Sequence, residues 1–141
     1  MSTDPFSRMN PHFSLSISIQ KSDIDELGHV NNVVYLRWVQ EVAAAHWNFV
    51  ASSELKTKYS WVVLRHEIDY RLPVFLEDHI IGSTWVGEYH GARFERFVKL
   101  CYAGSDKVVA EAKTMWCLLD GVTMKPKRID EEILSLLKAA Q

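Results

Sequence analysis

Hydrophobic and polar residues alternate along the segment from residue 13 to residue 20. The apolar positions are Phe13, Leu15, Ile17 and Ile19, and the positions between them hold serines and Gln20. A period of two places successive side chains on opposite faces of an extended chain. The segment therefore predicts a strand with one buried face and one face open to solvent.

The segment from Asn32 to about Ser52 has a different pattern, because its apolar residues cover most of the circumference of a helix. They are Val33, Val34, Tyr35, Leu36, Trp38, Val39, Val42, Ala43, Ala44, Ala45, Trp47, Phe49 and Val50. A helix that is apolar on nearly all sides is buried in a soluble protein. We expect a long central helix here, wrapped by other elements, and five strands of sheet would wrap it.

The rest of the chain predicts four more strands after a polar connection at residues 53–60. The strands cover residues 61–72, 79–89, 93–102 and 107–119. Short turns between them favour antiparallel neighbours. Asp130 is a candidate N-cap for a last short helix over residues 130–140. These elements predict an α+β chain, in which a curved antiparallel sheet of about five strands wraps one central helix. This is the architecture of the hotdog fold.

Composition narrows the class of protein. The 141 residues, with 48% hydrophobic residues and a net charge of −2, fit one folded domain over residues 11–141 behind a flexible lead-in at residues 1–10. No basic block predicts nucleic-acid binding, and no apolar run is long enough to span a membrane. Residues 1–10 lack the apolar core of a secretory signal. The two cysteines lack metal-ligand spacing and fall in apolar strands. We expect a cytoplasmic protein with reduced cysteines.

The candidate chemistry lies between the first strand and the central helix. Residues 23–32 contain Asp23, Asp25, Gly28, His29, Asn31 and Asn32. A helix start supplies unpaired backbone N–H groups and the positive end of the helix dipole. A carboxylate beside such a ready-made oxyanion pocket suggests attack on a carbonyl group.

The order of elements and this loop resemble the 4-hydroxybenzoyl-CoA thioesterase family of hotdog enzymes, most closely its acyl-CoA thioesterase branch. The matching run is Asp25-x-x-Gly28-His29-Val30-Asn31-Asn32-x-x-Tyr35-Leu36, and the resemblance extends over roughly residues 12–130. Plant acyl-ACP thioesterases have a similar loop. They carry an asparagine where this chain has Leu27, and that departure favours acyl-CoA over acyl-ACP.

The resemblance implies a role for several residues. Asp25 matches the carboxylate that acts as nucleophile or as general base for water. Asn32 matches the position whose backbone N–H polarises the thioester carbonyl. His29 and Asn31 match residues that orient the acid or the attacking water. We therefore take Asp25, Asn32 and His29 as the candidate catalytic residues.

Other residues are candidates for binding the substrate. Asn31 and Gly28 belong to the loop, where Gly28 allows a backbone conformation closed to other residues. Tyr35 lies where it would line an acyl channel, although core packing explains it equally well. Basic side chains suit the phosphates of CoA. The candidates on or near strands are Arg65, Arg93, Arg96 and Lys113, with Arg65 and Arg93 preferred.

Two further carboxylates have structural interpretations. Asp23 lies nearer the strand and is expected to stabilise the loop or form a salt bridge. Glu41 is expected to be a paired carboxylate on the central helix. The six histidines show no metal-ligand spacing, so no metal is expected.

The sequence thus predicts an acyl-CoA thioesterase that converts a fatty or aromatic acyl-CoA to free acid and CoA. No separate cofactor is expected, because CoA is part of the substrate and product. Since a hotdog chain leaves a sheet edge open, we expect a homo-oligomer, either a dimer or a dimer of dimers. An acyl-ACP thioesterase and a non-catalytic acyl-CoA-binding module remain as alternatives.

Overall fold

The computed structural model describes Asp4, Phe6 and residues 13–139. The predicted lead-in over residues 1–10 lies outside the described residues, apart from Asp4 and Phe6. The strands are β1 (Phe13–Ile17), β2 (Tyr59–Tyr70), β3 (Ile80–His90), β4 (Arg93–Tyr102) and β5 (Val108–Asp120). The helices are α1 (Asn32–Val50), α2 (Ser53–Lys58) and α3 (Glu131–Lys138), and a short 3-10 turn, η2, covers Lys21–Asp23.

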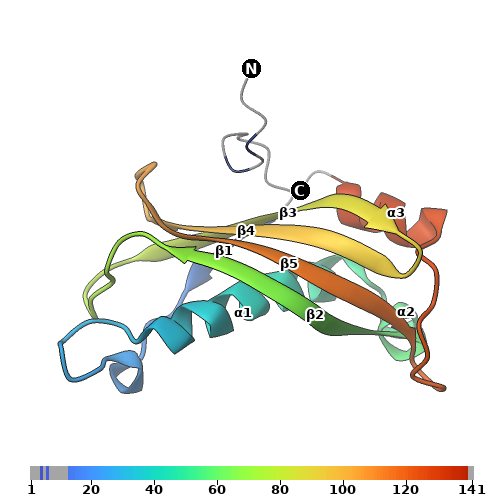
Figure 1. Ribbon diagram of the computed structural model, residues 1–141, viewed down its shortest axis with the longest axis horizontal. Helices are drawn as coiled ribbons and strands as arrows, with labels where there is room; N and C mark the ends of the chain where they lie inside the picture. Colours follow the sequence, from blue (N-terminus) through green and yellow to red (C-terminus); the bar gives the residue numbers. More distant parts are fainter. Residues whose placement is uncertain (1–3, 5, 7–12, 140–141) are drawn as a thin grey trace.

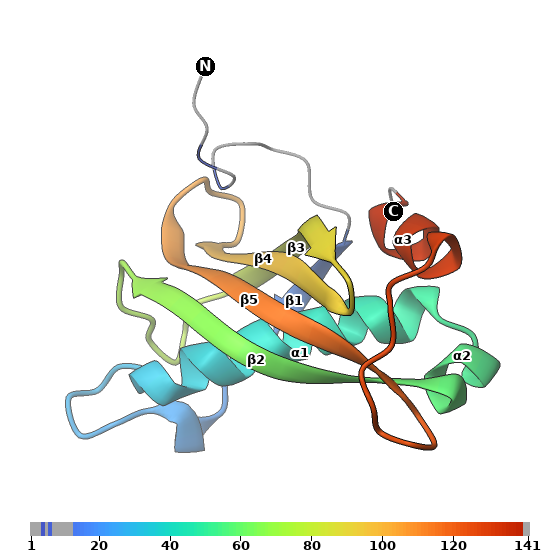
Figure 2. The same cartoon turned by 45° about the vertical axis from the view of Figure 1, so that its right-hand side comes forward.

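The five strands form a single antiparallel sheet in the order β1-β3-β4-β5-β2. Figures 1 and 2 show α1 running along one side of this sheet, with the loop that precedes α1 at one end and α2 at the other. The α+β class and the hotdog architecture predicted from the sequence are confirmed.

The alternating pattern of β1 is also confirmed, since Ile17 is buried while Ser14 and Ser16 are exposed. α1 packs against β1, β3 and β4. Its approach to β3 is close, because a Cβ built on Gly82 would lie 2.4 Å from Cγ2 of Val42. Glycine at position 82 therefore sets the distance between the helix and the sheet.

The sheet wraps α1 as predicted, but the wrapping is incomplete within the single chain. The residues that one face of the helix leaves exposed are Val33, Arg37, Gln40, Glu41, Ala44 and Asn48. The physical reason is that one sheet covers only one side of a helix. The sheet also has an exposed edge strand. β2 ends the sheet and exposes Val62, Leu64 and Tyr70.

A second correction concerns residues 53–60, which were expected to be a connection. They contain α2, whose first turn is capped by the Ser52 hydroxyl, which accepts a hydrogen bond from the Leu55 N–H at 3.2 Å. The last helix has its predicted cap, since the Asp130 carboxylate accepts from the Ile133 N–H at 2.9 Å.

The core between α1 and the sheet has two apolar clusters with polar residues between them. Val98 and Leu100 of β4 belong to the first cluster and Phe94 to the second. Arg96 lies between these positions on the same inward face of β4, paired in register with Thr114 of β5. We call Thr84, Arg96, Thr114 and His46 of α1 the polar layer; all four are buried.

Candidate active site

The loop between β1 and α1 is held at its base by Asp23. This residue is 2% exposed. Its carboxylate accepts hydrogen bonds from the Gln20 N–H at 2.9 Å and from the Arg37 guanidinium at 2.9 Å. Its carbonyl accepts from the Asn31 N–H at 2.9 Å, which ties the beginning of the loop to its end. The predicted structural role of Asp23 is confirmed.

Asp25 lies on a tight turn above this base. Its carbonyl accepts from the Gly28 N–H at 3.1 Å, and its N–H donates to the His29 carbonyl at 2.9 Å. Gly28 has a φ of 86° with no neighbour near its missing side chain, so the turn needs glycine for its conformation rather than for space. The glycine role predicted from the sequence has this physical basis.

The Asp25 carboxylate has one oxygen committed to the loop and one turned to His29. Oδ1 accepts from the Leu27 N–H at 2.9 Å, and Oδ2 lies 3.5 Å from Nδ1 of His29. The Asp25 side chain is 25% exposed and that of His29 is 33% exposed. The carboxylate is therefore oriented by the protein and still reachable by a ligand.

The start of α1 lies immediately after this turn. The Asn31 side chain caps the helix by accepting from the Val33 N–H at 3.1 Å. Asn32 is the first residue of the helix, and within the described part of the chain its N–H has no acceptor. An unpaired N–H at the positive end of a 19-residue helix is suited to stabilise a negatively charged oxygen.

Tyr35 lies in the core, where its side chain is closed to solvent. It is 2% exposed, stacks on Trp38 at 5.5 Å between ring centroids, and donates its hydroxyl to the Leu72 carbonyl at 2.9 Å. Burial raises the pKa of Tyr35 to about 12, so the phenol is neutral. These contacts give Tyr35 a packing role beneath the loop.

The two preferred candidates for the CoA phosphates are both exposed and lie away from the loop. Arg65 on β2 forms an ion pair with Glu67 at 2.7 Å. Arg93 begins β4 opposite Cys117 of β5, at the end of the sheet far from Leu72 and the loop. Within one chain, the structure does not bring either arginine together with Asp25.

The other named residues have settled structural partners. Lys113 pairs with Glu95 at 3.1 Å. Glu41 is exposed and pairs with Arg37 at 3.2 Å, as its predicted role as a paired carboxylate requires. Arg96, which the sequence grouped with the candidates for phosphate binding, is buried in the polar layer and lines a cavity. Its place on β4 between Phe94 and Val98 was the available signal, since alternate residues of a strand share a face.

The described residues contain neither a group of metal ligands nor a membrane-spanning helix. No group of three or more His, Cys, Asp or Glu side chains in residues 13–139, Asp4 or Phe6 is arranged to hold a metal ion. No helix of the described chain is long and apolar enough to cross a membrane.

Comparison with known proteins places the chain in a family. No curated protein sequence matches the chain. The crystal structure of the PA5185 protein from Pseudomonas aeruginosa matches with a TM-score of 0.82 and 20% identity, over 94% of this chain and 96% of that chain. A thioesterase complexed with coenzyme A and Zn from Thermus thermophilus matches with a TM-score of 0.79 and 20% identity, over 92% and 94%.

Slr0204, a 1,4-dihydroxy-2-naphthoyl-CoA thioesterase from Synechocystis, has a TM-score of 0.76 and 16% identity over 89% of this chain and 94% of that chain. At 16% to 20% identity, the likeness to these three structures shows the fold alone. The family itself is shown by the sequence, because the model of the thioesterase-like superfamily matches residues 19–137. The chain therefore belongs to the thioesterase-like superfamily, with the hotdog fold and the thioester hydrolase class that the sequence predicted.

Proposed function

We propose that the chain is an acyl-CoA thioesterase whose reaction takes place at the loop before α1. The observation that carries the proposal is the joining of Asp23 to Asn31 through one backbone hydrogen bond of 2.9 Å. This bond holds the turn that carries Asp25 directly at the start of α1. It thus joins the segment with a partly exposed carboxylate to the helix start with an unpaired N–H.

The proposed reaction is hydrolysis of a thioester. As a general base, Asp25 takes a proton from water while the water oxygen bonds to the carbonyl carbon. As a nucleophile, the carboxylate bonds to that carbon itself, and water later cleaves the resulting anhydride. In both cases the carbonyl oxygen becomes negative, the Asn32 N–H stabilises it, and the C–S bond breaks to release the CoA thiolate, which takes up a proton.

His29 has a positioning role in this proposal. Its Nδ1 lies 3.5 Å from Oδ2 of Asp25, and its ring also contacts Phe75 edge-on at 6.5 Å between ring centroids. A ring fixed in this way limits the rotation of the carboxylate. Asn31 acts indirectly, because its side chain caps the first turn of α1 and so holds the helix start in place.

CoA is the proposed carrier of the acyl group. The solved structures similar to this chain include complexes with CoA, among them the Thermus thermophilus thioesterase and the SAV2348 protein from Staphylococcus aureus. Arg65 and Arg93 are the proposed contacts for the phosphates of CoA. Both are too far from Asp25 in one chain, so this part of the proposal requires a second copy. We expect the enzyme to act in the cytoplasm, where acyl-CoA is made and used.

A homodimer is the proposed working form. β2 is an edge strand whose backbone hydrogen-bonding groups on one side have no partner strand. The same region exposes Val62 and Leu64 of β2, and beside the loop Leu27 is 78% and Val33 71% exposed. A second copy that extends the sheet at β2 covers this surface and brings its own residues toward the open face of α1.

The test is release of free thiol from a panel of acyl-CoA esters, from short to long and including aromatic ones. The same acyl groups on acyl carrier protein form a parallel series. We expect the wild type to hydrolyse acyl-CoA and Asp25→Ala to lose nearly all turnover. Glu26→Ala is the matched control, because Glu26 is the exposed carboxylate next to Asp25 in the same turn.

Three outcomes would contradict parts of the proposal. Turnover only of carrier-protein esters would favour an acyl-ACP thioesterase. Tight acyl-CoA binding without any turnover would favour a binding module. Full activity in folded Asp25→Ala would assign the chemistry to another residue.

A further inference from the structure

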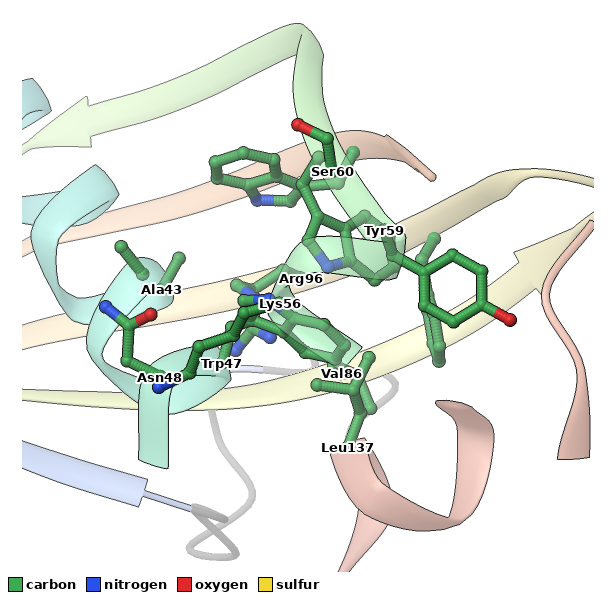
Figure 3. A pocket seen from close by; sticks show the side chains of 13 residues that line it. Ala43, Trp47, Asn48, Lys56, Tyr59, Ser60, Val86, Arg96 and Leu137 are labelled. Carbon is green, nitrogen blue, oxygen red and sulfur yellow. The ribbon is translucent and has the colours of Figure 1, made fainter. Parts of the chain in front are cut away.

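A second site lies at the other half of α1. A cavity of about 410 Å³ opens between α1, the first residues of β2, the inner face of the sheet and α3. This volume is in the range of small-molecule sites. Figure 3 shows its side chains converging from these elements around Arg96. Of the site residues predicted from the sequence, Arg96 alone lines it. Its first residue on α1, Ala43, is 11 positions after Asn32, which is about 17 Å along the helix.

Arg96 has an unusual environment for an arginine. It is 6% exposed, and one of its terminal nitrogens, Nη1, makes both of its side-chain hydrogen bonds. These go to Nδ1 of His46 at 3.0 Å and to the Thr84 hydroxyl at 2.9 Å. Among the described residues no carboxylate lies within ion-pair distance of Arg96, and no acceptor is found for its Nε or Nη2.

Burial of this guanidinium without a counter-charge is costly. Burial lowers the pKa of Arg96 to about 10, which still leaves the side chain protonated at neutral pH. A positive charge that no carboxylate of residues 13–139 neutralises calls for an anion from outside. Two of its donors remain available for that anion on the cavity side.

The remaining walls of the cavity fit an anion with an apolar body. Its lining contains two cations, Arg96 and Lys56, and no acidic residue. Trp47, Trp61, Trp116 and Phe94 provide aromatic surface. The indole N–H groups of Trp61 and Trp116 are buried and have no hydrogen-bond acceptor.

We propose that this cavity binds a small organic carboxylate, with its carboxylate on Arg96 and its apolar body among the tryptophans. A guanidinium presents two parallel N–H groups that match the two oxygens of a carboxylate. The proposal concerns binding only, and it stands whether or not the loop before α1 hydrolyses thioesters.

The test is calorimetric titration of the full-length protein with 4-phenylbutyrate and with its uncharged analogue 4-phenylbutyramide. Tryptophan fluorescence provides a second readout, because three tryptophans line the cavity. We expect the acid to bind at least about tenfold more tightly than the amide, since a hydrogen bond to a charged group contributes that much. This comparison needs no variant and does not depend on folding of a mutant.

Two variants locate the binding site. Arg96→Met is expected to reduce the affinity for the acid to that of the amide. Arg71→Met, which removes an exposed arginine that pairs with Glu111, is expected to leave it unchanged. Equal binding of acid and amide by the wild type, full affinity in folded Arg96→Met, or no binding of the acid would each overturn the proposal. The last result is the one expected if side chains of a second copy fill the cavity.

Discussion

The loop before α1 and the cavity beside the second half of α1 treat charge in opposite ways. In the loop, Asp23 and Asp25 both have donors: Asp23 binds Gln20 and Arg37, and Asp25 binds the Leu27 N–H. In the cavity, no carboxylate of the described residues pairs with Arg96, whose side-chain hydrogen bonds go to His46 and Thr84. The two ends of α1 therefore differ. The loop carboxylates are hydrogen-bonded by donors of the described chain, whereas the Arg96 guanidinium has no carboxylate partner among the described residues.

This difference teaches what each region is built to receive. The loop keeps its negative charge oriented and accessible beside the positive end of a helix, which suits chemistry at an electrophilic carbon. The cavity holds its positive charge in an aromatic enclosure, which suits retention of an anion. A reacting group must be reachable, whereas a binding group gains strength from exclusion of water.

Apart from loss of the Asp25 carboxylate itself, the largest expected effect at the loop comes from removing the Asn32 N–H. Proline at the first position of a helix is well tolerated, and the residue before it, Asn31, already has extended backbone with a ψ of 139°. We expect Asn32→Pro to lower kcat for thiol release by about 100- to 1,000-fold, because an oxyanion donor contributes that much. Asn32→Ala keeps the N–H and is expected to stay active. Equal activity of the two folded variants would remove Asn32 from the mechanism.

The next effect sharpens the contrast between buried and exposed carboxylates. Asp23→Ala leaves the part-buried Gln20 N–H and Nη2 of Arg37 without their acceptor. We expect a loss of about 2–3 kcal/mol in the free energy of unfolding, measured with urea. Glu41→Ala is the matched control, because Glu41 also pairs with Arg37 but lies at the surface. Its expected cost is below about 0.5 kcal/mol. Similar costs for the two would show that the loop is not anchored at Asp23.

Loss of the buried charge in the cavity is expected to change the free energy of unfolding far less than loss of the buried carboxylate of Asp23. Arg96→Met removes a buried charge that no carboxylate of the chain neutralises, so the free energy of unfolding is expected to stay within about 1 kcal/mol of wild type or to rise. Leu100→Ala, on the same inward face of β4 and fully buried, is expected to cost about 2–5 kcal/mol. A loss of that size in Arg96→Met would make the arginine a structural residue.

The smallest effect is a pH dependence at the edge of the polar layer. Burial lowers the pKa of His66 below its ordinary value of 6.5. The unfolded chain therefore takes up a proton that the folded chain does not, and stability falls as the pH decreases through and below 6.5. Above this range His66 is neutral in both states and contributes no slope. We expect His66→Gln to lose stability less steeply than wild type between neutral and mildly acidic pH, again by urea unfolding.

The elements with a strong local pattern could be predicted from the sequence. The alternation from Phe13 and the polar run at Asp25 gave the first strand and the candidate loop. α2 could not be predicted from periodicity, because five of its six residues are polar and its first turn depends on the Ser52 cap rather than on an apolar face. The open face of α1 escaped prediction for a different reason. Apolar residues around a helix indicate burial without indicating whether the cover comes from the same chain.

The cavity shows the remaining limit of sequence reasoning. The alternation of β4 placed Arg96 between Phe94 and Val98 on an apolar face, which was a readable signal. Its partners could not be read in the same way, because Nδ1 of His46 comes from a residue 50 positions away along the chain. Only the packing of α1 on the sheet brings the two together.

The most direct test of the central claim is kcat/KM for thiol release by Asp25→Asn on the best acyl-CoA ester. Asparagine has the shape of aspartate and can still accept the Leu27 N–H through Oδ1, so the turn is kept and the charge is removed. The account predicts a loss of about 100- to 10,000-fold, the range for a general base, with an unchanged unfolding midpoint. Wild-type kcat/KM in Asp25→Asn would contradict it, because the reaction would then not depend on the carboxylate at the start of α1.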